Sequence, residues 1–328
     1  MFPDHLAKNI CTPEVEQQPN RHGYGEGLLE AGKRDERVVA LAADLTGSTR
    51  THQFAEAFPS RFIQCGVAEQ NMASVASGMA AMGKIPFIAS YAMFSPGRSW
   101  EQVRTTIAYN DVNVKIIGAH AGISVGPDGA THQAVEDIAM MRVIPNMVVI
   151  APSDIHEARK AVLAAAQYEG PVYIRIERAP SPVVTTPQSP FAIGQAEYMY
   201  QNPEAGDRRV GIVVTGPLLH NALVAATKLV EEGYGVSVLH MPTIKPLDTV
   251  KLEELASTHT ALVTVEEHQQ AGGLGGAVAE HMSSVAPIMI KRVGVADEFG
   301  QSGTPEELIE HYGMGVDTIV EQAKAAVS

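Results

Sequence analysis

Cysteine is scarce in this chain, as are basic residues and long apolar runs. Only Cys11 and Cys65 occur among 328 residues, with no CxxC spacing, so neither a disulfide framework nor a zinc site is indicated and a reduced cytoplasm is expected. The 24 basic against 37 acidic residues give a net charge of −13, which disfavours generic binding to nucleic acid or anionic membranes. The N-terminal MFPDHLAKNI lacks a signal-peptide layout, and no apolar run reaches membrane-spanning length.

The patterns that are present predict an α/β fold. Hydrophobic residues make up 45% of the chain and charged residues 19%, as in ordinary globular proteins. The expected strands are residues 38–44, 62–67, 85–91, 114–120, 147–154 and 172–177, and the expected helices are residues 23–32, 71–83, 99–110 and 155–167. Because these strands and helices alternate, we expect a doubly wound parallel sheet.

A second, smaller α/β unit is expected after a change in composition. Residues 178–190, RAPSPVVTTPQSP, are rich in proline, serine and threonine, which favours an extended connection. Further strand and helix patterns follow at residues 210–216, 218–233, 234–241, 261–267 and 316–328. The expected divisions are an N-terminal extension at 1–17, a parallel-sheet domain at 18–180, a linker at 181–190 and a mixed-sheet domain at 191–328.

A single carboxylate, Glu69, lies between the strand-like residues 62–67 and the small-residue segment 71–83. Parallel sheets bind ligands at the carboxyl ends of their strands, so an acid at this point is a candidate functional group. Taken alone, however, Glu69 is also what the dipole at a helix N-terminus favours, and residue type alone supports that simpler explanation.

The loop HAGISVGPDGATHQ, from His120 to Gln133, follows the expected strand 114–120. Its position suits ligand binding, although its Gly, Pro and Asp residues also suit an ordinary surface loop. His120 and His132 lack the close spacing of helical metal ligands, and no third ligand is near, so no metal site is expected. Because histidine titrates near neutral pH, either ring could exchange protons with a sugar hydroxyl or carbonyl oxygen.

Four segments together, ADLTGS, GVAEQNM, SYAMF and HAGISVGPDGATHQAVED, resemble the pyrimidine-binding domain of transketolase in order and spacing. The resemblance continues through PSD and IRIER. The second domain, with LHMPTIKPLD, VTVEEH and DEFGQSG, is similar to the transketolase C-terminal domain. The resemblance as a whole covers residues 18–325, and the combined motifs are specific to enzymes that use thiamine diphosphate.

The resemblance implies a cofactor-binding set of residues. Glu69 would hydrogen-bond N1′ of the cofactor's aminopyrimidine and favour the imino tautomer that removes the thiazolium C2 proton. A charged acceptor in a mostly apolar pocket suits this task because its hydrogen bond is strong there. Tyr91 and Phe94 match aromatic residues that embrace the pyrimidine, and Asp44 and Leu45 match positions near the thiazolium.

The resemblance also implies transfer of a two-carbon ketol unit from a ketose phosphate to an aldose phosphate. His132 matches a position close to the reacting carbon and is expected in cofactor contact, donor binding and proton transfer. Asp128 would contact the donor's C2 hydroxyl, and arginine forks pair well with phosphate. The full substrate set is Arg21, Ser48, His120, Asp128 and Arg178, with His120 also catalytic. Many relatives carry another aromatic residue where this chain has Gly97.

One family motif is absent from this sequence. Transketolases carry GDG and a downstream Asn that bind Mg²⁺ and the diphosphate, and GDG does not occur in this chain. Because Mg²⁺ and two phosphates need a preformed set of oxygen ligands, we expect another polypeptide to supply them. The chain is therefore expected to be the C-terminal subunit of a split transketolase, inactive alone and paired with an N-terminal subunit in a heterotetramer of two copies of each.

Three alternatives remain open from the sequence. The β subunit of a 2-oxo acid dehydrogenase shares this two-domain plan, but the polar loop after His120 suits a polyol phosphate better. Half of a deoxyxylulose-phosphate synthase has a similar DGxTHQ loop, but tends to carry arginine at the position of His120. A non-catalytic regulatory partner is disfavoured because the chain retains all four of the residues Glu69, His120, Asp128 and His132. The sugars and the pathway, whether pentose phosphate or specialised, do not follow from the sequence.

Overall fold

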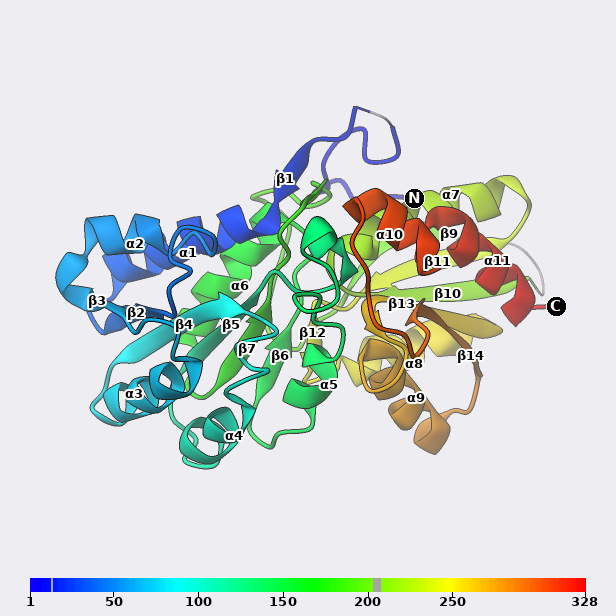
Figure 1. The fold of residues 1–328 in the computed structure, drawn as a ribbon. Helices are drawn as coiled ribbons and strands as arrows, with labels where there is room; N and C mark the ends of the chain where they lie inside the picture. The colour runs from blue at the N-terminus through cyan, green and yellow to red at the C-terminus, as the bar shows by residue number, and fades with distance from the viewer. Residues whose placement is uncertain (13, 203–207) are drawn as a thin grey trace.

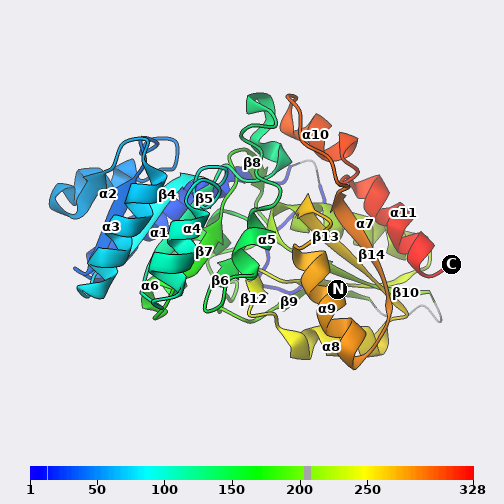
Figure 2. The same cartoon turned by 60° about the horizontal axis from the view of Figure 1, so that its bottom comes forward.

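In the part of the chain that the structure describes, two large β-sheets lie side by side, each covered by helices (Figures 1 and 2), and a short two-stranded sheet accompanies them. A computed structural model describes residues 1–12, 14–202 and 208–328. The larger sheet has seven strands, all parallel except β12 at one edge, which agrees with the predicted doubly wound fold. In order across the sheet they are β12 (Thr243–Lys245), β6 (Val148–Ile150), β7 (Val172–Arg175), β5 (Lys115–Ala119), β4 (Ile85–Tyr91), β2 (Val38–Ala42) and β3 (Phe62–Gln64).

The strands of this sheet are apolar on both faces because helices cover both. Leu28 and Val162 pack with Ala40 and Phe87 on one face, whereas helix α3 (Glu69–Ala81) and its neighbours cover the other. The helical segments of this region are α1 (Asn20–Arg34), α2 (His52–Ala57), η1 (Pro59–Arg61), α3 (Glu69–Ala81), α4 (Trp100–Gln102), η2 (Val103–Ala108), η3 (Ile123–Asp128), α5 (Asp137–Arg142) and α6 (Ile155–Gln167).

The smaller sheet is mixed, as predicted. Its five strands are, in order, β14 (Met289–Val295), β13 (Ala261–Gln269), β10 (Arg209–Val214), β11 (Gly235–His240) and β9 (Glu197–Asn202), and β9 runs antiparallel to β11. Its helical segments are η4 (Gly216–Leu218), α7 (Leu219–Glu231), α8 (Thr249–Thr258), α9 (Leu274–Val285), α10 (Pro305–His311) and α11 (Val316–Ala326).

The two sheets are joined more closely than the sequence indicated. Strand β12 follows the second sheet in the chain but pairs with β6 of the first. The N-terminal segment buries Leu6 and Ile10 in the core of the smaller sheet, and β1 (Gln17–Pro19) pairs with β8 (Pro180–Pro182). One apolar cluster extends from α3 to α9, so the same core supports both halves.

Several predicted boundaries were wrong by a few residues. The first helix begins at Asn20 and ends at Arg34 instead of covering 23–32, and α3 includes Glu69 itself. The predicted helix 99–110 is a short α4 followed by the π-helix η2. Within the described residues, no helix is both long and apolar enough to cross a membrane.

Candidate active site

The predicted site residues gather along one edge of the larger sheet. Strands β7, β5, β4, β2 and β3 are neighbours, and each is followed at its carboxyl end by one or more of these residues. They are Arg178 after β7, His120 after β5, Tyr91 at the end of β4, Asp44 after β2 and Glu69 after β3. Parallel pairing therefore brings together groups that are far apart in the sequence.

Glu69 is the first residue of α3 and is only 1% exposed. Its Oε2 accepts a hydrogen bond from Nη1 of Arg98 at 2.9 Å, and its Oε1 lies 3.4 Å from the donating hydroxyl of Ser90. A buried carboxylate needs such partners because burial removes its water. The sequence prediction placed Glu69 at a strand-to-helix junction, and the structure agrees.

Four rings form a cluster beside this carboxylate. Tyr91 stacks on His120 with ring centres 3.9 Å apart, and on Phe94 at 5.9 Å. The ring of His132 is edge-on to Phe94, with ring centres 5.5 Å apart, and to Tyr91, with ring centres 6.2 Å apart. The loop from 120 to 133 and the segment after β4 are therefore packed together, and their rings offer flat apolar surface next to hydrogen-bonding groups.

A group of cations lies close to His120. Arg21 on α1 donates from Nη1 to the carbonyl oxygen of Ser48 at 3.0 Å, and Arg178 donates to the carbonyl oxygen of Val125 at 3.0 Å. The pKa of Arg21 is lowered by burial and by the nearby charges of Arg50 and Arg178. This concentration of positive charge contrasts with the net charge of −13 and suits an anionic ligand.

His120 is strongly perturbed by its surroundings. Burial first, and then the charges of Arg21, Arg178 and His132, lower its pKa to about 3. Its Nδ1 is buried and has no hydrogen-bond partner among the described residues. An orphaned polar atom at this position indicates that a ligand, or water, completes the site.

The loop that carries the histidines is held by the smaller sheet. Glu267 on β13 accepts a hydrogen bond from the backbone N–H of Ser124 at 2.6 Å. Arg175 donates to the carbonyl oxygen of Glu267 at 2.7 Å and also pairs with Asp137 and Glu177. Burial raises the pKa of Glu177 to about 8, although Arg175 opposes the shift. Contacts from the smaller sheet thus hold the loop that carries His120 and His132.

Other predicted residues are less closely tied to the cluster. Asp44 is exposed, has a positive φ of 60° and donates its backbone N–H to Gln64; the neighbouring Leu45 is half-buried. Asp128 is exposed at the end of η3, and no hydrogen bond within the described residues joins its carboxylate to the rings. The structure leaves the predicted roles of all three as predictions.

Sequence reasoning missed three groups at this edge: Arg98, Ser90 and Arg50. Arg98 pairs with Glu69, and its guanidinium also lies 4.7 Å from the centre of the Phe94 ring. Arg50 bonds to His22 beside Arg21. Their positions in the sequence could have indicated them, since Arg98 follows the predicted aromatic pair and Arg50 follows the ADLTGS motif.

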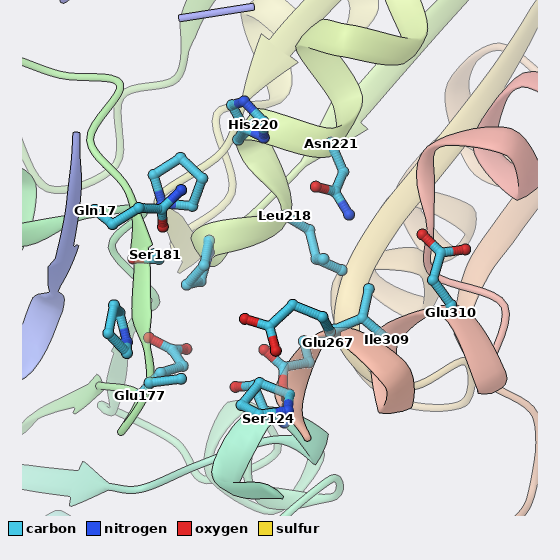
Figure 3. A pocket seen from close by; sticks show the side chains of 16 residues that line it. Gln17, Ser124, Glu177, Ser181, Leu218, His220, Asn221, Glu267, Ile309 and Glu310 are labelled. Atoms are coloured by element: carbon cyan, nitrogen blue, oxygen red, sulfur yellow. Dashed lines mark hydrogen bonds between the residues drawn. The ribbon is translucent and has the colours of Figure 1, made fainter. Parts of the chain in front are cut away.

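A pocket of about 310 Å³ lies behind the η3 loop, between the two sheets (Figure 3). Figure 3 shows the side chains of Glu177, Glu267 and Glu310 around it, with Ser124 and His220. The described residues that line it include four glutamates and neither lysine nor arginine, so it offers no guanidinium or ammonium group to a sugar phosphate. The basic group around His120 has the charge that an anionic ligand requires.

Comparison with known proteins identifies the family to which the chain belongs. Residues 16–182 match the pyrimidine-binding domain of transketolase, and residues 200–319 match the transketolase C-terminal domain. The chain belongs to the transketolase family. In transketolases the first of these domains binds thiamine diphosphate, and the buried carboxylate of Glu69 beside aromatic faces fits its aminopyrimidine ring. No cluster of metal-binding side chains occurs in the part of the chain that the structure describes.

The relatives include subunits of split transketolases. A Methanocaldococcus jannaschii protein named as a transketolase C-terminal section is 44% identical over 305 residues, covering 92% of this chain and 94% of that protein. A 6-deoxy-6-sulfo-D-fructose transketolase subunit from Clostridium sp. is 39% identical over 310 residues, covering 94% and 95%. A solved structure described as a split gene transketolase, inactive beta4 tetramer, matches with a TM-score of 0.87 and 43% identity, covering 94% and 98%. This transketolase chain is thus a C-terminal subunit of the split type.

Proposed function

We propose that this chain is the catalytic-carboxylate subunit of a two-chain transketolase that moves a ketol unit from a ketose phosphate to an aldose phosphate. A separate N-terminal subunit with a GDG motif would hold Mg²⁺ and the diphosphate group. The two chains would form a heterotetramer with two copies of each, and the cofactor would lie between them.

The observation that carries this proposal is the carboxyl edge of the larger sheet. One buried acid, Glu69, lies there beside stacked rings and a basic group that includes Arg21 and Arg178. A 2-oxo acid dehydrogenase subunit needs no group of cations for a sugar phosphate, whereas a transketolase does. A non-catalytic partner would not need to keep Glu69 buried and charged at this edge.

The chain's own side chains have distinct tasks in this proposal. Glu69 accepts a hydrogen bond from the N1′ position of the aminopyrimidine, and Tyr91 and Phe94 hold that ring from the sides. When bound, thiamine diphosphate supplies the carbon nucleophile that attacks the ketose carbonyl and carries the two-carbon unit. Asp44 and Leu45 border the thiazolium.

The substrate is bound and protonated from the opposite side. Arg21, Ser48 and Arg178 bind the terminal anion, and Asp128 contacts the donor's C2 hydroxyl. His120 stays neutral because its pKa is about 3, so it can accept or donate a hydrogen bond without an added charge. His132 exchanges protons with the oxygen at the reacting carbon.

The anion that the arginines bind at the end of the sugar could be a phosphate or a sulfonate. A relative is named for a sulfo-sugar, and guanidinium groups bind either tetrahedral anion. We propose a phosphate because the charges of Arg50 and Arg178 lie close enough to Arg21 to help lower its pKa, and such a group of cations matches a ligand that carries up to two negative charges.

Reconstitution tests the proposed function. This chain and a GDG-bearing N-terminal subunit are purified separately, and ketol transfer between sugar phosphates is measured for each chain and for the mixture with thiamine diphosphate and Mg²⁺. We expect activity only in the mixture, in line with the related β tetramer described as inactive. Ketol transfer by this chain alone would refute the two-chain proposal.

A further inference from the structure

Arg98 occupies an unusual position in the site. It follows Gly97 in the segment after β4, and its side chain is 48% exposed although its partner Glu69 is 1% exposed. One nitrogen of the guanidinium donates to Glu69 at 2.9 Å, and the same group lies 4.7 Å from the centre of the Phe94 ring. A partly exposed cation therefore pairs with a buried acid and lies over an aromatic ring.

These two contacts are also those that an aminopyrimidine requires. A guanidinium is planar, donates N–H groups to carboxylates and stacks on aromatic rings. An aminopyrimidine is also planar, needs a carboxylate at its N1′ position and stacks on an aromatic face. Arg98 and the ring would thus compete for Glu69 and Phe94.

The pairing with Arg98 has a physical purpose when no ring is bound. The carboxylate of Glu69 is buried, and its other hydrogen bond, from Ser90, is long at 3.4 Å. A buried charge without a counter-ion destabilises a fold, so Arg98 stabilises the chain before cofactor arrives.

A pocket next to Arg98 can receive its side chain after displacement. This pocket has a volume of about 270 Å³ and is lined by Met93, Gly97, Arg98 and the carboxylate-bearing Glu136, among others. The half-buried Glu136 is an acidic neighbour for the displaced cation. The guanidinium therefore has space and a possible partner outside the ring site.

We propose that Arg98 is a displaceable placeholder for the aminopyrimidine ring, holding Glu69 and Phe94 until thiamine diphosphate binds. This inference rests on the proposed function, because it concerns the same cofactor site. It implies that the cofactor's affinity reflects competition with a residue of the same chain. Arg98 is then a positioning residue of the empty enzyme and not part of the loaded site.

A double-mutant cycle on this chain alone tests whether the pair matters when no cofactor is bound. The free energy of unfolding by urea is measured for R98M, E69Q and the double variant, with R104M as control because Arg104 is an exposed arginine nearby. We expect R98M to lower the free energy of unfolding of the wild-type chain, and R104M to have little effect. When Glu69 is already replaced by E69Q, adding R98M should cause no further decrease. Additive effects of R98M and E69Q would overturn the placeholder.

Cofactor binding to the two-chain complex provides the second test, measured by calorimetric titration with thiamine diphosphate. We expect R98M to bind about two- to fivefold more tightly than wild type, since a competing partly exposed charge pair is lost, with R104M unchanged. If the wild-type complex binds thiamine diphosphate and R98M binds it equally or less tightly, only the placeholder role of Arg98 is overturned. A wild-type complex that binds no thiamine diphosphate would refute the proposed function as well.

Discussion

At the scale of single residues, the site depends on polar groups that are removed from water. Glu69 and His120 are both buried at the sheet edge, one as an acceptor with an arginine partner and one as a ring with an orphaned nitrogen. Each would interact strongly with a ligand because water screens little there.

Replacing Glu69 tests the acid directly. In the reconstituted complex, E69Q keeps the size of the side chain but loses its charge, so we expect kcat to fall by about 10²- to 10⁴-fold, the range of acid–base contributions. Steady-state ketol transfer provides the measurement, and circular dichroism checks the fold. Full activity of E69Q would favour a catalytically silent subunit.

The basic group is tested by comparing substrates. R21M and R178M each remove a charge from the anion site, so we expect kcat/KM for a ketose phosphate to fall about tenfold or more, as for loss of a charged hydrogen bond. The same variants should change kcat/KM little for the unphosphorylated ketose. An equal loss for both substrates would contradict anion binding by these arginines.

At the scale of elements, the turn after β4 sets the shape of the ring site. A Cβ built at Gly97 would lie 2.1 Å from the carbonyl oxygen of Met93, so this turn has no space for a larger side chain at position 97. Instead, the turn brings the following Arg98 to Glu69. The same backbone path therefore requires a small residue at position 97 and places Arg98 next to Glu69.

A substitution at Gly97 should therefore destabilise the chain. We expect G97A to lower the free energy of unfolding by about 1–3 kcal/mol, the usual cost of forcing extra volume into a packed position. The matched control is G78A, because Gly78 lies in helix α3 with nothing near its Cβ position, and alanine there should be neutral or stabilising. Equal effects of the two substitutions in urea unfolding would contradict the close packing.

The ion pair between β11 and α6 predicts a pH dependence of stability. Burial disfavours a charged His240, but the carboxylate of Glu157, at 2.8 Å, outweighs it and raises the pKa of His240 above its usual 6.5. A raised pKa in the fold gives stability that is fully present below pH 6.5 and is lost as pH rises through the raised value. Wild type should lose more stability than E157Q on going from acidic to alkaline pH in urea titrations. Parallel pH profiles would contradict the pairing.

At the scale of the whole molecule, the two sheets support one site. Local patterns predicted the alternating strands, the mixed second sheet and the junction at Glu69, because apolar periodicity and chain order are visible in the sequence. They did not predict the pairing of β12 with β6 or the burial of Leu6 and Ile10, since these depend on contacts between distant segments. Arg98 was missed for the same reason: its partner lies 29 residues away.

The central claim is that the cofactor site is complete only when two chains meet. Calorimetric titration of thiamine diphosphate with Mg²⁺ tests it most directly, applied to this chain, to the GDG-bearing subunit, and to their complex with wild-type chain or with E69Q. We predict tight binding by the wild-type complex, one cofactor for each copy of this chain, and much weaker binding by either chain alone and by E69Q. Binding by this chain alone that is as tight as by the complex would contradict the account.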